Sequence, residues 1–350
     1  MRGKKHILVI RLSAMGDVAM MVPVLRALTD QHKRVKVTVV SRGFFKPFFN
    51  GIPNVNFFIV DPNGKHKGII GLLRLFFELK KLHIYGVVDL HNVLRSNIIT
   101  GLFKWFKGKK TAKLDKARAE RKALTRSNNK VFEPLTPMIE RYVDVFEKLG
   151  YTIDLSEVKF PEKQHFTSDV LAITGERKEN WIGIAPFAKH RSKIYPKDLM
   201  KEVIRELALK PGNKIFLFGA GINEIHGLER FAEGLDSVFV AAGKMSFKQE
   251  LQLITNLDVM LSMDSGNAHI AAMYGVNVVT LWGATHPYAG FAPFNQPEEN
   301  SLTSDREQYP KLPTSIYGNK KVEGYEDAMR TIKPEDVVNK VNTYLKYNRL

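Results

Sequence analysis

The sequence contains no cysteine, only three tryptophans and no long apolar run. The lack of cysteine excludes disulfides, thiolate nucleophiles and cysteine-ligated metals. No apolar stretch reaches the roughly 18–20 residues of a membrane-spanning helix, and no small-residue cleavage site follows the short apolar core near the N-terminus. We therefore expect a cytoplasmic protein. Hydrophobic residues make up 44% of the chain and charged residues 25%, a composition typical of a folded globular protein.

Acidic residues are scarce beside basic ones, since 36 Asp and Glu against 53 Lys and Arg give a net charge of +17. Such an excess indicates a polyanionic partner, either nucleic acid, an anionic membrane surface or a phosphorylated substrate. Much of the charge lies in residues 104–130, a stretch that begins at Lys104, ends at Lys130 and includes Trp105 and Phe106. The stretch predicts a local basic patch.

With 350 residues, the chain exceeds the usual size of one domain. Short apolar runs alternate with helical patterns in both halves, which is typical of parallel sheets covered by helices. We predict an α/β protein with two Rossmann-like domains, residues 1–165 and 166–350, facing each other across a cleft, with a final helix able to pack back on the first domain. The expected strands are 7–10, 35–40, 57–60, 85–89, 182–185, 214–218, 237–240, 259–262 and 277–281.

Ligands of open α/β sheets bind beyond the carboxyl ends of the strands, so the loops there are the candidate sites. The sharpest one is DSGNAH, which starts at Asp264 and opens a helix. Ser265 and Gly266 let a phosphate approach the unpaired N–H groups of the first turn, and His269 can donate to the same anion. This pattern predicts a diphosphate cradle. The alternative is that Asp264 or Ser265 caps the helix and His269 packs inside.

Two further loops carry charge at strand ends. The loop PFAKHRSKIYP holds Lys189, His190, Arg191 and Lys193, which would neutralise a leaving diphosphate, with Lys193 best placed; the alternative is a solvated run of charges. The turn FGAGINE ends in Glu224, which either binds ribose hydroxyls or stabilises the start of its own helix. Neither the GxGxxG fingerprint nor a Walker lysine motif is present.

The loop RLSAMGD follows the first expected strand and ends in Asp17. A carboxylate at that position can take the proton from an acceptor hydroxyl as a general base. The alternative is a first-turn aspartate that only stabilises its helix. We also expect Ser13 and Gly16 of this loop, together with Lys189, among the ligand-binding residues.

Taken together, these loops resemble the ADP-heptose:lipopolysaccharide heptosyltransferases of glycosyltransferase family 9. The order, separation and strand context of the motifs agree with that family over most of the chain. The resemblance implies a GT-B fold with the acceptor on the N-terminal domain and the nucleotide-sugar on the C-terminal domain. Its anchors are ILVIRLSAMGDVAMMVPVLRAL, APFAKHRSKIYP, FGAGINE and AAGKMSFKQELQLITNLDVMLSMDSGNAHIAAMYGVNVVTLWGATHP.

The resemblance also implies residue roles in an inverting transfer of heptose from ADP-heptose. Asp17 would be the general base, Lys193 the diphosphate ligand and Glu224 the ligand of the ribose. The diphosphate and the donor sugar would be held by Asp264, Ser265, Gly266 and His269. No cofactor and no metal is expected, because Lys193, His269 and the helix dipole can stabilise the leaving charge.

The expected partners are a phosphorylated lipopolysaccharide core or lipid A acceptor and the anionic inner face of the inner membrane, which residues 104–130 would contact. We expect a peripheral, monomeric protein that binds no nucleic acid. Phe187 and Ala188 stand where the family often has small hydroxyl residues, and Tyr195 stands where it often has Trp, so the donor pocket is expected to differ. The rival hypotheses are a transferase of another nucleotide-sugar, a nucleic-acid-binding protein, a nucleotide-sugar epimerase and a catalytically silent relative.

Overall fold

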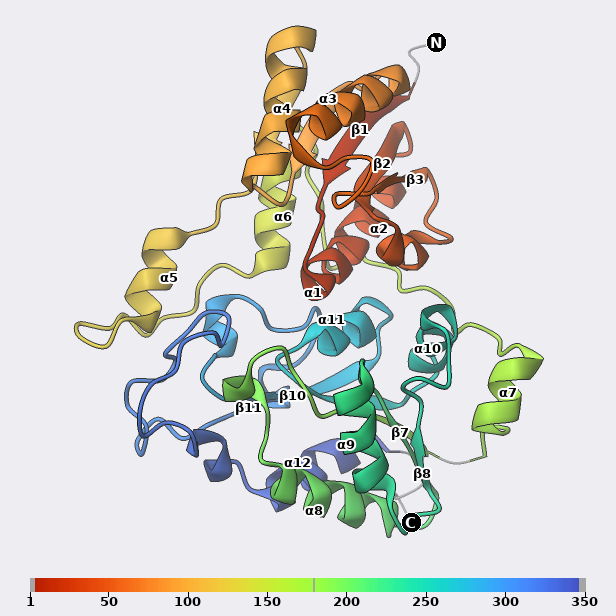
Figure 1. Cartoon of the computed structure of the whole chain (residues 1–350), viewed down its shortest axis with the longest axis vertical. Coiled ribbons are helices and arrows are strands. Elements are labelled where there is room, and N and C mark those ends of the chain that lie inside the picture. Colours follow the sequence, from red (N-terminus) through yellow and green to blue (C-terminus); the bar gives the residue numbers. More distant parts are fainter. Residues whose placement is uncertain (1–3, 179, 346–350) are drawn as a thin grey trace. The chain divides into compact units, whose positions relative to one another are not determined.

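The computed structural model describes residues 4–178 and 180–345 (Figure 1). The chain forms two compact units, of which the first comprises Met1–Lys116 and Thr136–Phe160 and the second Ala117–Leu135 and Pro161–Leu350. Each unit is built around its own parallel sheet, which confirms the predicted α/β class with two Rossmann-like units. Within the described ranges, no helix has both the length and the apolar character needed to span a membrane.

The first sheet has the strand order β3-β2-β1-β4-β5, and all its pairs are parallel. The apolar run of β1 is buried on both faces, as expected of a central strand between layers of helices. Ile10 pairs with Val40 on one side and with Asp89 on the other, so the carboxyl ends of three strands meet at one edge. The strands are β1 (Lys5–Ile10), β2 (Val35–Arg42), β3 (Val55–Val60), β4 (Gly86–Asp89) and β5 (Lys110–Lys113).

The helices of the first unit cover this sheet. Leu72, Phe76 and Phe103, from α3 and α4, pack in one cluster with Leu8 of β1, while α2 contacts α6. Helix α4 ends at Gly108, whose positive φ of 56° is accessible to glycine without strain. The helices are α1 (Met15–Ala19), α2 (Met21–Gln31), α3 (Gly68–Leu79), α4 (Leu94–Lys107) and α6 (Met138–Glu147), with 3-10 segments η1 (Gly43–Phe49) and η2 (Lys80–Leu82).

The second sheet has the order β11-β10-β9-β6-β7-β8 and is also parallel. Gly183 of β6 permits close packing, since a Cβ there would lie 2.5 Å from Leu257. Because β6 pairs with both β7 and β9, the loops that follow these three strands are neighbours. The strands are β6 (Asn180–Ala185), β7 (Asn213–Leu217), β8 (Val238–Val240), β9 (Val259–Met263), β10 (Asn277–Trp282) and β11 (Ser301–Thr303).

The helices of the second unit enclose a core in which α12 packs against α8. Ser246 caps α10 by accepting a hydrogen bond from the backbone N–H of Gln249. The helices are α5 (Arg118–Thr125), α7 (Ser168–Thr174), α8 (Lys197–Ala208), α9 (Ile222–Ala232), α10 (Phe247–Ile254), α11 (Gly266–Met273) and α12 (Pro334–Asn342), with 3-10 segments η3 (Arg191–Lys193), η4 (Pro287–Ala289), η5 (Glu298–Asn300) and η6 (Ala328–Thr331).

The basic stretch 104–130 is divided between the units after Lys116. Its second part supports the fold of the second unit. Arg121 is buried and donates to the hydroxyl of Tyr317 at 2.8 Å, and Lys130 donates to two backbone carbonyls, one of them that of Pro313 at 2.8 Å. The stretch is therefore not one uniform surface patch, because hydrogen bonds within the protein hold these two cations.

Candidate active site

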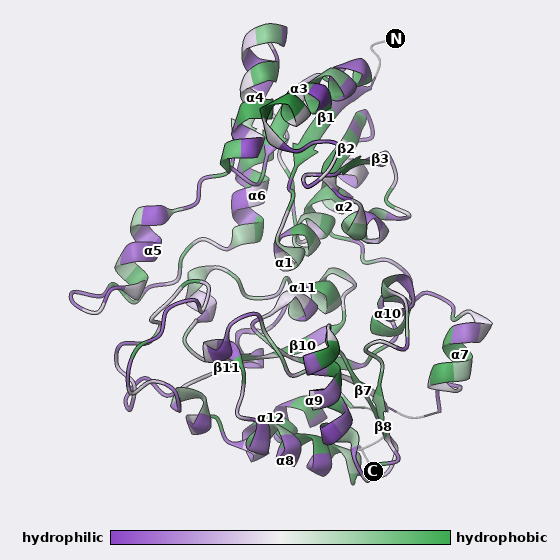
Figure 2. Cartoon of the chain, viewed as in Figure 1, coloured by the Kyte–Doolittle hydropathy of each residue, from purple (hydrophilic) through white to green (hydrophobic). Residues whose placement is uncertain are grey.

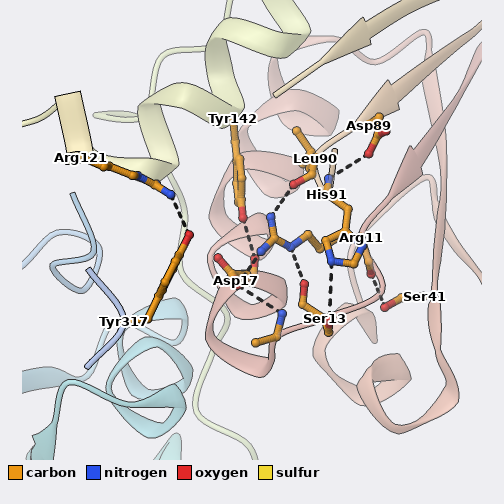
Figure 3. A network of polar contacts seen from close by, with 11 residues as sticks. Arg11, Ser13, Asp17, Ser41, Asp89, Leu90, His91, Arg121, Tyr142 and Tyr317 are labelled. Carbon is orange, nitrogen blue, oxygen red and sulfur yellow. Dashed lines mark hydrogen bonds and ion pairs between the residues drawn. The ribbon is translucent and has the colours of Figure 1, made fainter. Parts of the chain in front are cut away.

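In the first unit, the loop after β1 leads directly into α1, and Asp17 is the third residue of that helix. Its Oδ2 lies 2.5 Å from Nη2 of Arg11 and accepts a hydrogen bond from the backbone N–H of Ala14 at 3.2 Å (Figure 3). The carboxylate thus stabilises the first turn of its helix, as the alternative interpretation proposed. It also stays 19% exposed and is oriented by a guanidinium group, which is more than a helix cap requires.

Arg11 is itself fixed by contacts with distant parts of the first unit. The buried guanidinium donates from Nε to the carbonyl of Ser13 at 2.7 Å and from Nη1 to the carbonyl of Leu90. It lies over the ring of Tyr142 at 5.9 Å, and the hydroxyl of Tyr142 donates to the carbonyl of Asp17 at 3.2 Å. The position of the carboxylate is therefore set by Arg11 of the loop after β1, by Tyr142 of α6 and, through Arg11, by the backbone of the loop after β4.

His91 follows β4 and faces the same loop. Its Nε2 lies 3.5 Å from Oγ of Ser13, and its backbone N–H donates to Oδ1 of Asp89 at 2.9 Å (Figure 3). Burial, reinforced by the nearby charge of Arg11, lowers the pKa of His91 to about 4. The imidazole is consequently neutral at neutral pH, so it can exchange hydrogen bonds there without adding a positive charge.

In the second unit, the main feature is an ion pair at the start of α11. Nζ of Lys193 lies 2.9 Å from Oδ2 of Asp264, and the hydroxyl of Thr285 donates to the same oxygen at 2.8 Å. The two charged side chains are only 12% and 9% exposed. An ammonium group is thus held in a shielded position beside the end of β9, where it acts with less competition from water.

The loop that carries Lys193 is shaped by two glycines from distant segments. Gly318 has a φ of +77°, and a Cβ there would lie 2.5 Å from Cδ of Lys193, while Ser192 donates to the Gly318 carbonyl at 2.7 Å. At Gly283, a Cβ would lie 2.4 Å from the carbonyl oxygen of Ser192. A side chain at either glycine would displace the lysine.

The N-terminus of α11 is not capped by the side chains that precede it. Ser265 occupies the N-cap position but makes no capping bond, and its hydroxyl lies 3.0 Å from that of Ser262. Asp264 is engaged by Lys193 and Thr285 instead. Gly266 opens the helix, and the buried His269 lies one turn further on. Ser265 thus does not cap the helix, whereas the burial of His269 agrees with the alternative in which it packs inside; the anion site stays a prediction.

The other predicted residues of this unit lie in neighbouring loops. Lys189 is exposed, and burial, together with Lys189 and Lys193, lowers the pKa of the adjacent His190. Oε2 of Glu224 accepts from the backbone N–H of Ala220 at 2.8 Å. That contact orders the turn after β7, which is the structural role named as its alternative.

Tyr195, which was expected to alter the donor pocket, lies in the interior of the second unit. Tyr195 is 1% exposed, and its hydroxyl donates to the carbonyl of Ile332 at 2.6 Å. Burial raises the pKa of this phenol above its usual value. Phe187 also packs on the core, with its ring 6.2 Å from that of Phe231. Both side chains therefore take part in packing, and their effect on the donor pocket stays a prediction.

The structure thus brings some of the predicted residues together within each unit. Ser13, Gly16 and Asp17 share one loop and helix of the first unit, and Lys193 contacts Asp264 in the second. Sequence reasoning missed Arg11 as the partner of Asp17 and Thr285 as the partner of Asp264, although both stand inside quoted motifs. Over the described ranges, no group of three or more His, Asp or Glu side chains is arranged to hold a metal ion.

Comparison with known proteins gives the family of the chain. The model of glycosyltransferase family 9 (heptosyltransferase) matches residues 72–320. The chain belongs to glycosyltransferase family 9. The matched range includes every predicted donor-site residue of the second unit, but not the loop of Asp17. The enzyme class expected from the resemblance, a glycosyltransferase, is confirmed.

Relatives of this family 9 chain cover nearly all of it. Lipopolysaccharide heptosyltransferase 1 of Campylobacter coli is 25% identical over 95% of this chain and 96% of its own length. The solved family 9 structure from Veillonella parvula has a TM-score of 0.74 at 20% identity, and covers 98% of both chains. The E. coli ADP-heptose lipopolysaccharide heptosyltransferase II has a TM-score of 0.66 at 18% identity, over 97% of this chain and 98% of that one. The GT-B fold is thereby shown.

Proposed function

We propose that this family 9 glycosyltransferase transfers heptose from ADP-heptose to a lipopolysaccharide core or lipid A acceptor, with inversion at the anomeric carbon. The observation that carries the proposal is the shielded pair of Lys193 and Asp264 at an uncapped helix N-terminus. It supplies a fixed cation and free N–H groups at one point, which is what a departing diphosphate requires. The heptose donor is taken from the relatives, whose names include ADP-heptose.

The donor would bind along the carboxyl edge of the second sheet. Its diphosphate would contact the first turn of α11 at Ser265 and Gly266, with Lys193 and His269 as cationic or hydrogen-bonding side chains. Glu224 would reach the ribose through the carboxylate oxygen that does not bind Ala220. Lys189, which is exposed in the same loop as Lys193, would contact the outer phosphate.

Asp17 would act as the general base, with Ser13 and Gly16 lining the same loop. The acceptor hydroxyl gives its proton to the carboxylate as its oxygen bonds to the anomeric carbon. The bond from that carbon to the diphosphate oxygen breaks on the opposite face, and ADP leaves with the electron pair. Arg11 orients the carboxylate for this step. Charge stabilisation by Lys193, His269 and the dipole of α11 makes a metal ion unnecessary.

We further infer a peripheral location at the cytoplasmic face of the inner membrane, where an acceptor of this class is anchored. The protein would act there as a monomer and bind no nucleic acid. Exposed lysines of residues 104–116, together with Lys122, would attract both the phosphorylated acceptor and anionic lipids. Each cation near such a surface contributes about 1 kcal/mol.

The test is the release of ADP from ADP-heptose with and without a heptose-deficient lipopolysaccharide acceptor, beside UDP- and GDP-sugar controls. Acceptor-dependent release of ADP is the expected result. Release from another donor would retain the transferase chemistry and refute heptose as the transferred sugar. If no nucleoside diphosphate were released from any donor, catalysis would be refuted and a binding protein supported. The stereochemistry of the product, read by NMR at the anomeric proton, tests inversion separately.

A further inference from the structure

Helix α3 is apolar on the side that faces solvent as well as on the side that faces the sheet. Leu72, Leu75, Phe76 and Leu79 pack into the core of the first unit. The opposite side presents large apolar side chains, of which Ile70 is 79% exposed and Phe77 52% exposed. Figure 2 shows apolar colour over much of this helix. A surface helix normally has a polar outer side, so α3 requires an explanation.

The exposed apolar residues of α3 lie on one side of the helix. They are Ile69, Ile70, Leu73 and Phe77, whose spacing of one, four and eight residues places them within a continuous arc. Exposed cations border this arc. Arg74 lies in the helix, and Lys80 and Lys81 follow it, with Nζ of Lys80 4.7 Å from the ring centre of Phe77.

The C-terminal turn of α4 repeats this combination. Trp105 is 79% exposed and Phe106 73% exposed, so neither side chain belongs to the core. Lys104 and Lys107 are also exposed, and Nζ of Lys104 lies 5.3 Å from the Trp105 ring. The two helices contact each other, with the rings of Phe76 and Phe103 5.0 Å apart. We call the exposed residues of the two helices the α3–α4 face: Ile69, Ile70, Leu73, Arg74, Phe77, Lys80, Lys81, Lys104, Trp105, Phe106 and Lys107.

The charges of this face select its occupant. Within residues 67–81 and 104–110 taken together, the sequence has a single acidic residue, Glu78. Its carboxylate lies 2.7 Å from Nζ of Lys65 and 3.4 Å from Nε2 of His66. Isolated apolar side chains on a surface are ordinary, but several exposed apolar side chains with exposed cations beside them are complementary to an anionic and apolar partner. A bilayer with anionic headgroups has both properties.

We propose that the α3–α4 face inserts into the interfacial region of an anionic lipid bilayer. Ile69, Ile70 and Phe77 would enter the boundary between headgroups and acyl chains, with Trp105 at the headgroup level. The lysines would extend their stems along the apolar surface and place their ammonium groups on lipid phosphates. This inference rests on the proposed function, since an acceptor anchored in the membrane gives the surface its purpose. It assigns insertion to helices of the first unit.

The experiment is co-sedimentation of the full chain with phosphatidylcholine vesicles that contain or lack phosphatidylglycerol. A triple variant, Ile69→Ser, Ile70→Ser and Phe77→Ser, should lower binding to the anionic vesicles by about a hundredfold or more, because three apolar side chains that would enter the bilayer are lost. The matched control is Leu171→Ser with Leu209→Ser, which removes exposed apolar residues of the second unit and should bind as the wild type does.

A charge variant tests the other half of the inference. Binding of this variant should fall by roughly tenfold or more and should become less sensitive to salt and to phosphatidylglycerol than binding of the wild type. Its substitutions are Lys80→Gln, Lys81→Gln, Lys104→Gln and Lys107→Gln. Thermal unfolding should be unchanged in the apolar and charge variants, since the altered side chains are exposed.

The inference would be overturned if the triple variant bound the anionic vesicles as strongly as the wild type. It would also be overturned if the wild type did not bind them. If the triple variant instead lost self-association in sedimentation velocity and bound vesicles normally, the face would be a contact between copies of the chain. The vesicles contain neither donor nor acceptor. Vesicle binding without ADP release therefore refutes the proposed function alone, and ADP release without vesicle binding refutes this inference alone.

Discussion

Replacing Lys193 by Met tests the buried ion pair of the second unit, because methionine keeps an apolar stem but removes the ammonium group. Nζ of Lys193 lies 2.9 Å from Asp264, with both side chains shielded. Loss of one partner from a buried pair costs about 3–5 kcal/mol, since the other charge stays buried without compensation. Thr285 still donates to Asp264, so we expect the lower end of this range, about 3 kcal/mol. The midpoint of thermal unfolding should fall by roughly 6–12 °C.

The same replacement should weaken ADP binding by roughly 10- to 100-fold, because a hydrogen bond to a charged group contributes about 1.5–3 kcal/mol. Asp264→Asn is the matched control. It keeps an oxygen acceptor for Thr285 and removes a negative charge beside the proposed diphosphate position. This variant should be less stable than the wild type, yet bind ADP at least as tightly. Calorimetric titration with ADP and thermal unfolding of both variants measure the two quantities.

Three results would contradict this reasoning. Wild-type ADP affinity in Lys193→Met would show that the ammonium does not contact the diphosphate. An equal loss of affinity in Asp264→Asn would show that ADP binding needs the intact ion pair and not the ammonium alone. If the change in unfolding free energy of the double variant equalled the sum of the two single changes, the 2.9 Å contact would contribute no coupling energy. We expect a coupling energy of about 1–3 kcal/mol.

Further predictions concern the base, the pH dependence of stability and the core. Asp17→Asn should lower turnover by roughly 10²–10⁴-fold with ADP affinity unchanged, and retained turnover would exclude Asp17 as the base. Burial, with Arg306 nearby, lowers the pKa of His286 to about 4. The unfolded chain then binds a proton that the folded chain does not between about pH 6.5 and 4, so stability falls as the pH falls through this window. In His286→Gln, denaturant titrations should show a loss of unfolding free energy over this pH range that is smaller than in the wild type by up to about 3 kcal/mol. Tyr195→Phe should cost about 1–3 kcal/mol through the unpaired carbonyl of Ile332 and leave ADP affinity intact, whereas weaker ADP binding would return Tyr195 to the donor pocket.

The strands and the loops that follow them could be predicted from local pattern. Buried parallel strands need near-continuous apolar runs, and every expected strand is present. The sequence predicts neither β5 nor β11. Each lies at the edge of its sheet, where a strand is little buried and needs few apolar residues. β5 reads KTAK and buries only Ala112, and β11 has three half-exposed residues.

The contacts that define the site could not be predicted, because they join residues distant in the chain. Arg11 was visible in the loop of Asp17, but its other partners come from Leu90 and Tyr142, and their proximity depends on the fold of the whole unit. In the second unit, the cap of α11 was left open between two interpretations. The contact of Asp264 with Lys193 could not be read from the sequence, because the two residues lie in separate loops.

The net charge of +17 suggested a single basic patch, but the cations have different physical roles. Arg11 and Lys193 are paired with carboxylates, and Arg121 and Lys130 hold loops of the second unit. Burial beside Arg306 lowers the pKa of Lys130 to about 8, and its ammonium group already donates to the carbonyls of Leu124 and Pro313, so it is a poor ligand for lipid phosphates. Attraction to a membrane should therefore follow the exposed lysines that stand beside exposed apolar side chains, and not the total charge. That is why the α3–α4 face, which includes only the first residues of the basic stretch, is the stronger candidate for the membrane contact.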